Sequence, residues 1–286
     1  MKLDGRRESS NVEDRRGKGT KRASLGIGGL IIVGLITWFM GGNPMDVLKQ
    51  GAGDILQSPQ GATQEYVPTA EEEELAKLVK VVLAGTEDVW TKVFAEQGLQ
   101  YQPPKLVMFT DAVQSGCGGA SSQVGPFYCS ADQTVYIDLS FFKQMKSQLK
   151  AGGDFAYAYV IAHEVGHHVQ YLLGTLDQAH QQMARMSKTD ANKVSVRLEL
   201  QADYYAGLWA HHDDARYGTL EPGDLEEGIN AAHAIGDDKL QMEAQGYTVP
   251  DAFNHGTSQQ RMAWLNKGYQ VGTLEGGDTF RLQDPS

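Results

Sequence analysis

Hydrophobic and polar residues alternate with three different periods along this chain, and each period predicts a different kind of element. Residues 23–42, "ASLGIGGLIIVGLITWFMGG", form an uncharged apolar run that as a helix would measure about 30 Å, the thickness of a bilayer core. "KLVMFT" and "TVYIDLSFF" are β-branched and aromatic runs of the kind that predicts strands. Helical spacing of apolar residues is found over 69–98 and near 154–173, 176–187, 190–213, 222–236 and 257–268.

Strands followed by a long run of helices favour an α+β domain, mostly helical with a small sheet, over a doubly wound one. A capping threonine and a first turn of glutamates open the helix at Thr69, and Gly85 predicts a break within it. We expect a head at 1–22, a membrane helix at 23–42, a flexible linker at 43–67, the main domain at 68–270 and a loose tail at 271–286.

The charge distribution bears on location. Residues 1–22 hold eight Lys or Arg and four Asp or Glu, whereas the whole chain carries a formal charge of -11. An acidic body argues against a nucleic-acid partner. The basic head before the apolar run predicts a cytoplasmic N-terminus and a single-pass membrane protein whose domain is exported. The alternative, a cleaved signal peptide, lacks a clear cleavage site in "GGNPMDV".

Cysteine usage agrees with export. Cys117 and Cys129 both follow the apolar run, and an even pair in an oxidising compartment predicts one disulfide that closes a short loop. The alternative is two buried free thiols.

The segment "HEVGHH" has the spacing of a zinc site. His163 and His167 are four residues apart, so on a helix both imidazoles leave one face and can bind one Zn²⁺. Glu164 lies beside the first histidine and is our candidate general base. Gly166 keeps the face between the ligands open for a sheet edge or a substrate. His168 points about 100° away from His167 and is expected to be a bystander.

A candidate third ligand lies downstream in "RLELQADYYAGLWA". Glu199 and Asp203 are four residues apart on an otherwise apolar helical face. We assign Glu199 as the third metal ligand and Asp203 as the acceptor that orients a ligand imidazole. The alternative is a solvated carboxylate pair on a surface helix.

His255, in the loop "NHGTSQQR", is our candidate for stabilising the oxyanion, with a structural histidine as the alternative. Other polar groups are given structural roles. We expect packing roles, with hydrogen-bond donation at the site as the alternative, for Tyr157, Tyr159, Tyr204 and Tyr205. His211 and His212 are expected at the end of a helix, and Asp237 and Asp238 in a turn where they bind backbone amides. A second metal at His211 and His212 and a calcium role for Asp237 and Asp238 are weaker alternatives.

Taken together, "HEVGHH", "ELQAD", "AIGDD" and "HGTSQQR" behind a head reading "KLDGRRESSNVEDRRG" resemble the bacterial membrane proteins described as the "putative neutral zinc metallopeptidase" family. The resemblance covers nearly the whole chain and implies a zincin-like fold with Glu199 as the third ligand. It also implies a single-pass protein of the bacterial inner membrane, with a cytoplasmic N-terminus and a periplasmic or extracellular domain. Relatives of this kind have Cys where this chain has Tyr204 and a second Cys where it reads "EGGDTF". A second disulfide is therefore not expected, and the tail should be less restrained.

These features predict a membrane-anchored zinc metalloendopeptidase that hydrolyses peptide bonds, with Zn²⁺ as cofactor, an activated water as nucleophile and Glu164 as base. A catalytically weak zincin-fold binding or assembly factor of the cell envelope is the alternative, and a zinc hydrolase acting on other substrates is a third. A peptide or protein is the expected substrate, while the oligomeric state is left open.

Overall fold

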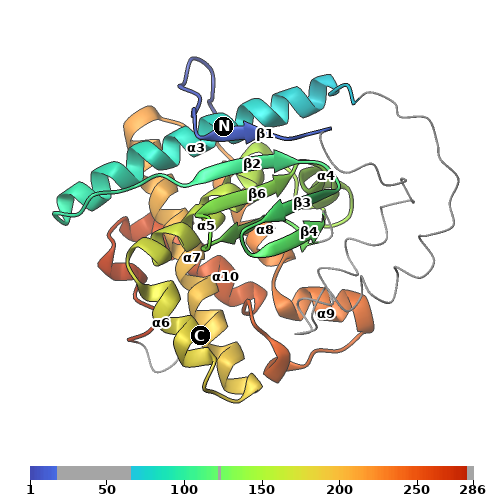
Figure 1. Cartoon of the computed structure of the whole chain (residues 1–286), viewed down its shortest axis with the longest axis vertical. Helices are drawn as coiled ribbons and strands as arrows, with labels where there is room; N and C mark the ends of the chain where they lie inside the picture. Colours follow the sequence, from blue (N-terminus) through green and yellow to red (C-terminus); the bar gives the residue numbers. More distant parts are fainter. Residues whose placement is uncertain (18–65, 122–123, 282–286) are drawn as a thin grey trace, which may run out of the picture.

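The computed structural model describes residues 1–17, 66–121 and 124–281. A four-stranded sheet lies in front of a group of helices, with α3 running along its β1 edge (Figure 1). The strands are β1 Val12–Asp14, β2 Lys105–Phe109, β3 Ala112–Ser115, β4 Gly118–Ser121, β5 Phe127–Cys129 and β6 Thr134–Asp138. The α-helices are α3 Ala70–Glu96, α4 Ser140–Ser147, α5 Asp154–Leu172, α6 Thr175–Met183, α7 Lys188–Tyr217, α8 Asp224–Ala234, α9 Asp237–Gln245 and α10 Ser258–Val271. Two short 3-10 turns, η3 Pro250–Ala252 and η4 Glu275–Gly277, complete the described elements.

The sheet order is β1-β2-β6-β5, and β3 and β4 form a separate antiparallel hairpin. β1, β2 and β6 are parallel, whereas β5 runs antiparallel to β6 and forms one edge. This arrangement confirms the α+β class. The two cysteines form the expected disulfide, which joins the β3–β4 hairpin to the end of β5.

Helix α5 lies at the centre of the fold. Nearly all of its side chains are buried, and it packs against α7, α8 and α3. Its apolar positions therefore serve the core on several sides at once, while its second half carries the HExxH residues.

Three expectations for element boundaries are wrong. The helix from Ala70 continues through Gly85 without a break. The glycine serves packing and not a break, since it leaves room for the side chains of Asp213 and Arg6 against the helix. The strand expected over "TVYIDLSFF" ends at Asp138, whose carboxylate accepts the backbone N–H of Ser140 at 2.9 Å and starts α4. α9 lies where no helix was predicted. The β3–β4 hairpin agrees with the Gly-rich sequence "GCGGASSQVGPFYCS", which predicts a loop or hairpin between the two strands.

The expected loose tail is packed as far as Arg281. The Tyr204 hydroxyl donates to the backbone oxygen of Thr273 at 2.6 Å, and Gln201 donates to that of Gly277 at 2.9 Å. A Cβ on Gly276 or Gly277 would collide with the Tyr204 ring. A tyrosine therefore fastens this segment to α7 at the position where a cysteine was expected in relatives.

The head is also different from the expectation. Residues 1–17 are packed on the domain, with β1 paired to β2 through Val12↔Leu106, so a boundary after residue 22 does not set them apart. The apolar run at 23–42 and most of the expected linker lie outside the described residues. Among the helices that are described, none combines the length and the apolar character that crossing a bilayer requires.

Candidate metal centre

The centre is formed where α5 crosses α7. A Cβ on Gly166 would lie 3.1 Å from both the Cα and the backbone oxygen of Ala202. The small residue therefore permits close contact between two helix backbones, and the approaching group is α7 rather than the expected sheet edge or substrate. This crossing places the HExxH face of α5 opposite the "ELQAD" face of α7.

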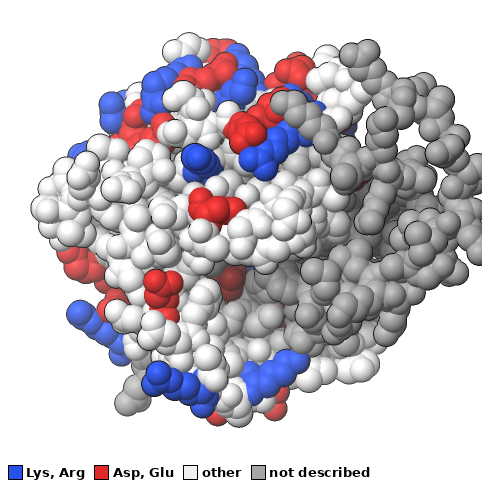
Figure 2. All heavy atoms as spheres, in the orientation of Figure 1, with Lys and Arg blue, Asp and Glu red and all other residues white. Residues whose placement is uncertain are grey.

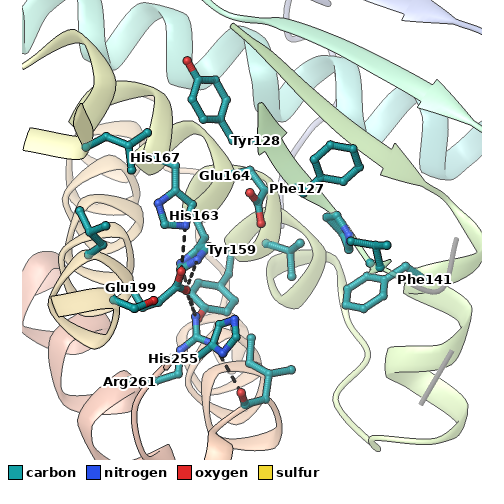
Figure 3. A pocket seen from close by; sticks show the side chains of 18 of the residues that line it. Phe127, Tyr128, Phe141, Tyr159, His163, Glu164, His167, Glu199, His255 and Arg261 are labelled. Carbon is teal, nitrogen blue, oxygen red and sulfur yellow. Dashed lines mark hydrogen bonds and ion pairs between the residues drawn. The ribbon is translucent and has the colours of Figure 1, made fainter. Parts of the chain in front are cut away.

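His163, His167 and Glu199 converge at the crossing (Figure 3). The Nε2 atom of His163 lies 3.2 Å from Glu199 Oε2, and that of His167 lies 3.4 Å from Glu199 Oε1. One possible ligand atom from each residue lies within 4.8 Å of the others. Two imidazoles and one carboxylate are the donor set of catalytic zinc sites with an open fourth position, so these residues fit Zn²⁺. It is the one such cluster of three or more groups within the described residues.

Each imidazole is held by a partner on its other nitrogen. Asp203 Oδ1 lies 2.9 Å from Nδ1 of His163, as expected for the orienting carboxylate. Gln170 Oε1 lies 2.8 Å from Nδ1 of His167, and the Gln170 amide in turn donates to the backbone oxygen of Leu198 at 2.7 Å. Both Nε2 atoms are thereby directed at Glu199. The sequence reasoning missed Gln170, although its position three residues after His167 was a usable signal.

A buried arginine completes the environment of Asp203. Arg261 on α10 donates to both carboxylate oxygens of Asp203, at 2.9 and 3.0 Å, and Tyr159 donates to Oδ1 at 2.6 Å. Asp203 is fully buried and Arg261 is 2% exposed. The sequence reasoning quoted "HGTSQQR" but gave Arg261 no role, and it assigned Tyr159 to packing. A charged residue in a predicted helix next to a candidate site was the available signal.

These contacts shift the pKa values of the buried histidines and carboxyl groups. Burial disfavours the imidazolium of His163, but the carboxylates of Asp203 and Glu199 outweigh it and raise its pKa to about 10. Burial also opposes the charge on Glu199, yet His167, His255 and His163 hold the pKa of that carboxyl well below its usual range. The site therefore keeps a carboxylate at neutral pH, and a metal ion that binds there must displace protons from the histidines.

Glu164 is directed into the cavity beside the ligands (Figure 3). It is 8% exposed, and burial raises the pKa of its carboxyl. The cavity measures about 340 Å³ and reaches from the ligands to His255 and to Phe127 and Tyr128 of β5. A carboxyl group with a raised pKa at the wall of a cavity is better suited than an exposed glutamate to take up and return a proton.

His255 lies at the same cavity, in the loop before α10. Asp237 Oδ2 accepts the backbone N–H groups of Asn254, His255 and Gly256 at 2.7 to 3.0 Å, and its Oδ1 lies 3.3 Å from His255 Nδ1. Asp238 accepts the N–H of Ser258 at 2.7 Å. Both aspartates thus bind backbone amides, as predicted, but from the first turn of α9 and not from a local turn. Both carboxylates are used within the protein.

The other histidines have structural contacts. His168 lies between the hydroxyl of Tyr128 at 2.9 Å and the backbone oxygen of Gln102 at 2.7 Å, away from the cluster. His211 and His212 each contact a backbone oxygen, of Tyr269 and Gly272, at 2.8 Å. His168 is thus a bystander to the metal cluster, as expected. The expectation that His211 and His212 lie at a helix end is wrong, because α7 continues to Tyr217 and both imidazoles bind the backbone at the end of α10.

The remaining expected packing residues are part of the core. Tyr157 stacks on Phe142 with ring centroids 4.7 Å apart, and Tyr205 meets Trp90 edge to face at 5.4 Å. Neither residue belongs to the metal cluster.

A metal-binding triad and a neighbouring carboxyl group at one cavity define a zinc peptidase of the HExxH class. The chain belongs to the family described as "Putative neutral zinc metallopeptidase", whose model matches residues 1–280. It is 49% identical over 291 residues to the uncharacterized protein YpfJ of Escherichia coli K12, covering 98% of this chain and 99% of that protein. It is 43% identical over 194 residues to the uncharacterized protein Rv2575 of Mycobacterium tuberculosis, covering 64% of each. No solved structure matches the chain significantly.

Proposed function

We propose that this protein is a zinc endopeptidase of zincin-like architecture that hydrolyses internal peptide bonds. The observation that carries the proposal is the convergence of His163, His167 and Glu199 next to Glu164 in one cavity. The donor set suits zinc, and the cavity leaves room for a substrate beside the base.

Bound zinc would supply Lewis acidity, which makes a water molecule more acidic and polarises the scissile carbonyl. Glu164 accepts a proton from the attacking water, whose oxygen bonds to the carbonyl carbon. The same carboxyl group then donates that proton to the nitrogen as the C–N bond breaks. Its raised pKa supports both directions of transfer, because the protonated and ionised forms are closer in free energy than in an exposed glutamate.

His255 is proposed to donate a hydrogen bond to the oxygen of the scissile carbonyl as negative charge develops on it. Its position at the cavity and the binding of its loop by Asp237 support this role. A donor fixed in advance stabilises the transition state without the cost of reorganising when the reaction occurs.

β5 is proposed to bind the substrate backbone. It pairs with β6 on one side, and among the described strands none pairs with its other edge. Phe127 and Tyr128 of β5 line the cavity. An extended peptide can add to such an edge through main-chain hydrogen bonds, which favours cleavage of unfolded segments over folded ones.

We also propose that the protein is attached to a membrane through the apolar run at 23–42 and that its domain lies in an oxidising compartment. The first part rests on sequence. The disulfide between Cys117 and Cys129 supports the second.

The test compares the full-length protein with Glu164→Gln, using zinc content and the cleavage products of a mixed peptide library. Glu96→Gln, on an exposed position, is the matched control. Wild type and control should each bind one zinc and cleave, whereas Glu164→Gln should bind zinc and lose at least about 100-fold in rate. If wild type binds zinc but cleaves nothing that Glu164→Gln leaves intact, the peptidase proposal fails and a binding or assembly factor becomes the better reading.

The ligand assignment has its own test. Glu199→Ala should lower zinc affinity on the order of tenfold or more, since loss of a ligand matters at least as much as loss of its orienting partner. Unchanged affinity in a chelator competition would place the third ligand elsewhere.

A further inference from the structure

The N-terminal segment, residues 1–17, binds to buried carboxylates of the domain. Arg6 donates to both oxygens of Asp213, at 2.8 and 2.6 Å, and to the hydroxyl of Thr219 at 2.9 Å. The Asp213 side chain is 2% exposed. Fork-shaped pairing of this kind needs both partners in a fixed position, so Arg6 is part of the interior at this point.

A second buried carboxylate is occupied by the same segment. Glu87, on α3, accepts from Arg7 at 2.8 Å, from Ser9 at 2.5 Å and from Asn11 at 2.8 Å. Its side chain is 9% exposed, and these three partners all lie in residues 1–17. Without the segment, α3 would present a charged group on a face that is otherwise mainly apolar, which is unfavourable unless the group is paired.

Gly85 of α3 also lies at the site where Arg6 binds. It lies in the interior of α3, where glycine weakens a helix. A Cβ there would lie 2.8 Å from Nη2 of Arg6 and 2.7 Å from Oδ1 of Asp213. The glycine therefore makes room for the arginine of the N-terminal segment.

The backbone is also engaged. Leu106 N–H donates to the oxygen of Asn11 at 2.9 Å, and Arg15 N–H donates to that of Met108 at 2.8 Å, on either side of the parallel pairing of β1 with β2. At the end of the segment, a Cβ on Gly17 would lie 2.5 Å from that of Tyr66. The two ends of the described chain that flank residues 18–65 are thus in contact.

We infer that residues 1–17 and the peptidase domain lie in the same compartment, as one folded unit. A single membrane crossing between Gly17 and Tyr66 would place Arg6 and Asp213 on opposite sides of the bilayer. The expected arrangement, with a cytoplasmic N-terminus and an exported domain, is therefore incompatible with the fold, whichever compartment the unit occupies. Membrane attachment through residues 23–42, as proposed above, must then leave both flanking segments on the same side of the membrane.

The charge argument for the earlier arrangement is weakened by the same contacts. Arg6, Arg7, Arg15 and Arg16 contributed half of the basic residues of the head, and each is paired with a carboxylate. Arg6 and Arg16 are enclosed by the folded unit, with side chains 11% and 5% exposed. Charged residues of both signs lie together on the surface over β1 and α3 (Figure 2). The head is therefore not a free cationic segment of the kind that holds an N-terminus in the cytoplasm.

The test uses two exposed residues that face each other, Glu8 and Lys80, whose charged groups are 3.4 Å apart. Glu8→Cys and Lys80→Cys are introduced separately into the full-length chain, and intact spheroplasts are treated with a membrane-impermeant maleimide. We expect both cysteines to be labelled or both to be protected until the membrane is permeabilised. Labelling of one with protection of the other overturns the inference.

A second measurement tests contact directly. The double variant Glu8→Cys/Lys80→Cys should be cross-linked within one chain by a short, permeant bismaleimide in unbroken cells. Glu8→Cys/Lys193→Cys is the matched control, because Lys193 lies twenty residues along α7 from Asp213, about 30 Å. A cross-link that forms only after detergent is added also overturns the inference. Neither measurement depends on peptidase activity.

Discussion

Replacing Asp203 by asparagine should damage folding and zinc binding through two separable contacts. The carboxylate is fully buried and accepts from Arg261 through two bonds, from Tyr159 and from His163. Asn keeps the shape but removes the charge. Arg261, 2% exposed, would then be a buried cation without its main partner, and breaking such a pair costs about 3 to 5 kcal/mol.

Zinc affinity should fall by about 10 to 100-fold, since His163 loses a carboxylate that orients it. This corresponds to about 1.4 to 2.8 kcal/mol of binding free energy. The assay has two parts: urea unfolding of the full chain with a chelator present, and zinc competition against a chromophoric chelator. The chelator in the first part prevents zinc binding from contributing to stability.

The double variant Asp203→Asn/Arg261→Met separates the two effects. Removing the unpaired cation should recover more than half of the lost stability, because an apolar side chain of similar length suits the buried position. Zinc affinity should not recover, since His163 still lacks its carboxylate. If the double variant is no more stable than Asp203→Asn, or if the single variant loses less than about 1 kcal/mol, the reasoning about the buried pair is wrong.

Three further predictions concern stability away from the ligands. Gly207→Ala should cost more than about 2 kcal/mol in urea unfolding, because the new Cβ would lie 2.1 Å from the backbone oxygen of Leu265; near-normal stability would mean that α7 and α10 can move apart. Burial lowers the pKa of His168 to about 4, below the ordinary value, so between about pH 6.5 and 4 the unfolded chain binds a proton that the folded chain does not. The free energy of unfolding should therefore decrease by up to about 3 kcal/mol as the pH is lowered through this window. The variant His168→Gln should lose this part of the pH dependence. Replacing Cys117 and Cys129 by serine opens a loop with a sequence separation of 12 and should cost about 3 kcal/mol; equal stability with and without reductant in wild type would contradict this.

The parts of the structure that sequence predicts well are those set by local periodicity. The helix carrying His163, expected over 154–173, is observed as Asp154–Leu172, and the fold class follows from strands preceding helices. Spacing of four residues on a helix also predicts which side chains share a face, so the pairs His163/His167 and Glu199/Asp203 could be proposed before their helices were seen to meet.

The parts that were missed depend on contacts between distant segments. Gly85 predicts a helix break by propensity, but the partner that makes a glycine useful there, Arg6, lies far away in sequence. Arg261 could not be linked to Asp203 without knowing that α10 packs on α7. The basic residues of the head indicated a membrane orientation because their buried carboxylate partners, Asp213 and Glu87, were not visible in sequence.

The close crossing at Gly166 and Ala202 also bears on which metal the protein selects. Neither residue offers a ligand, yet the missing side chain of Gly166 lets α5 and α7 approach closely, and a Cβ there would hold them further apart. The separation of the two helices determines the distance from the histidines to Glu199. Zinc binds imidazole nitrogen at about 2.0 to 2.1 Å, so a wider crossing would suit a larger cation better. In a survey of random substitutions, Gly166 should therefore tolerate replacement as poorly as the metal ligands do. Part of the metal preference is encoded in a residue that has no side chain.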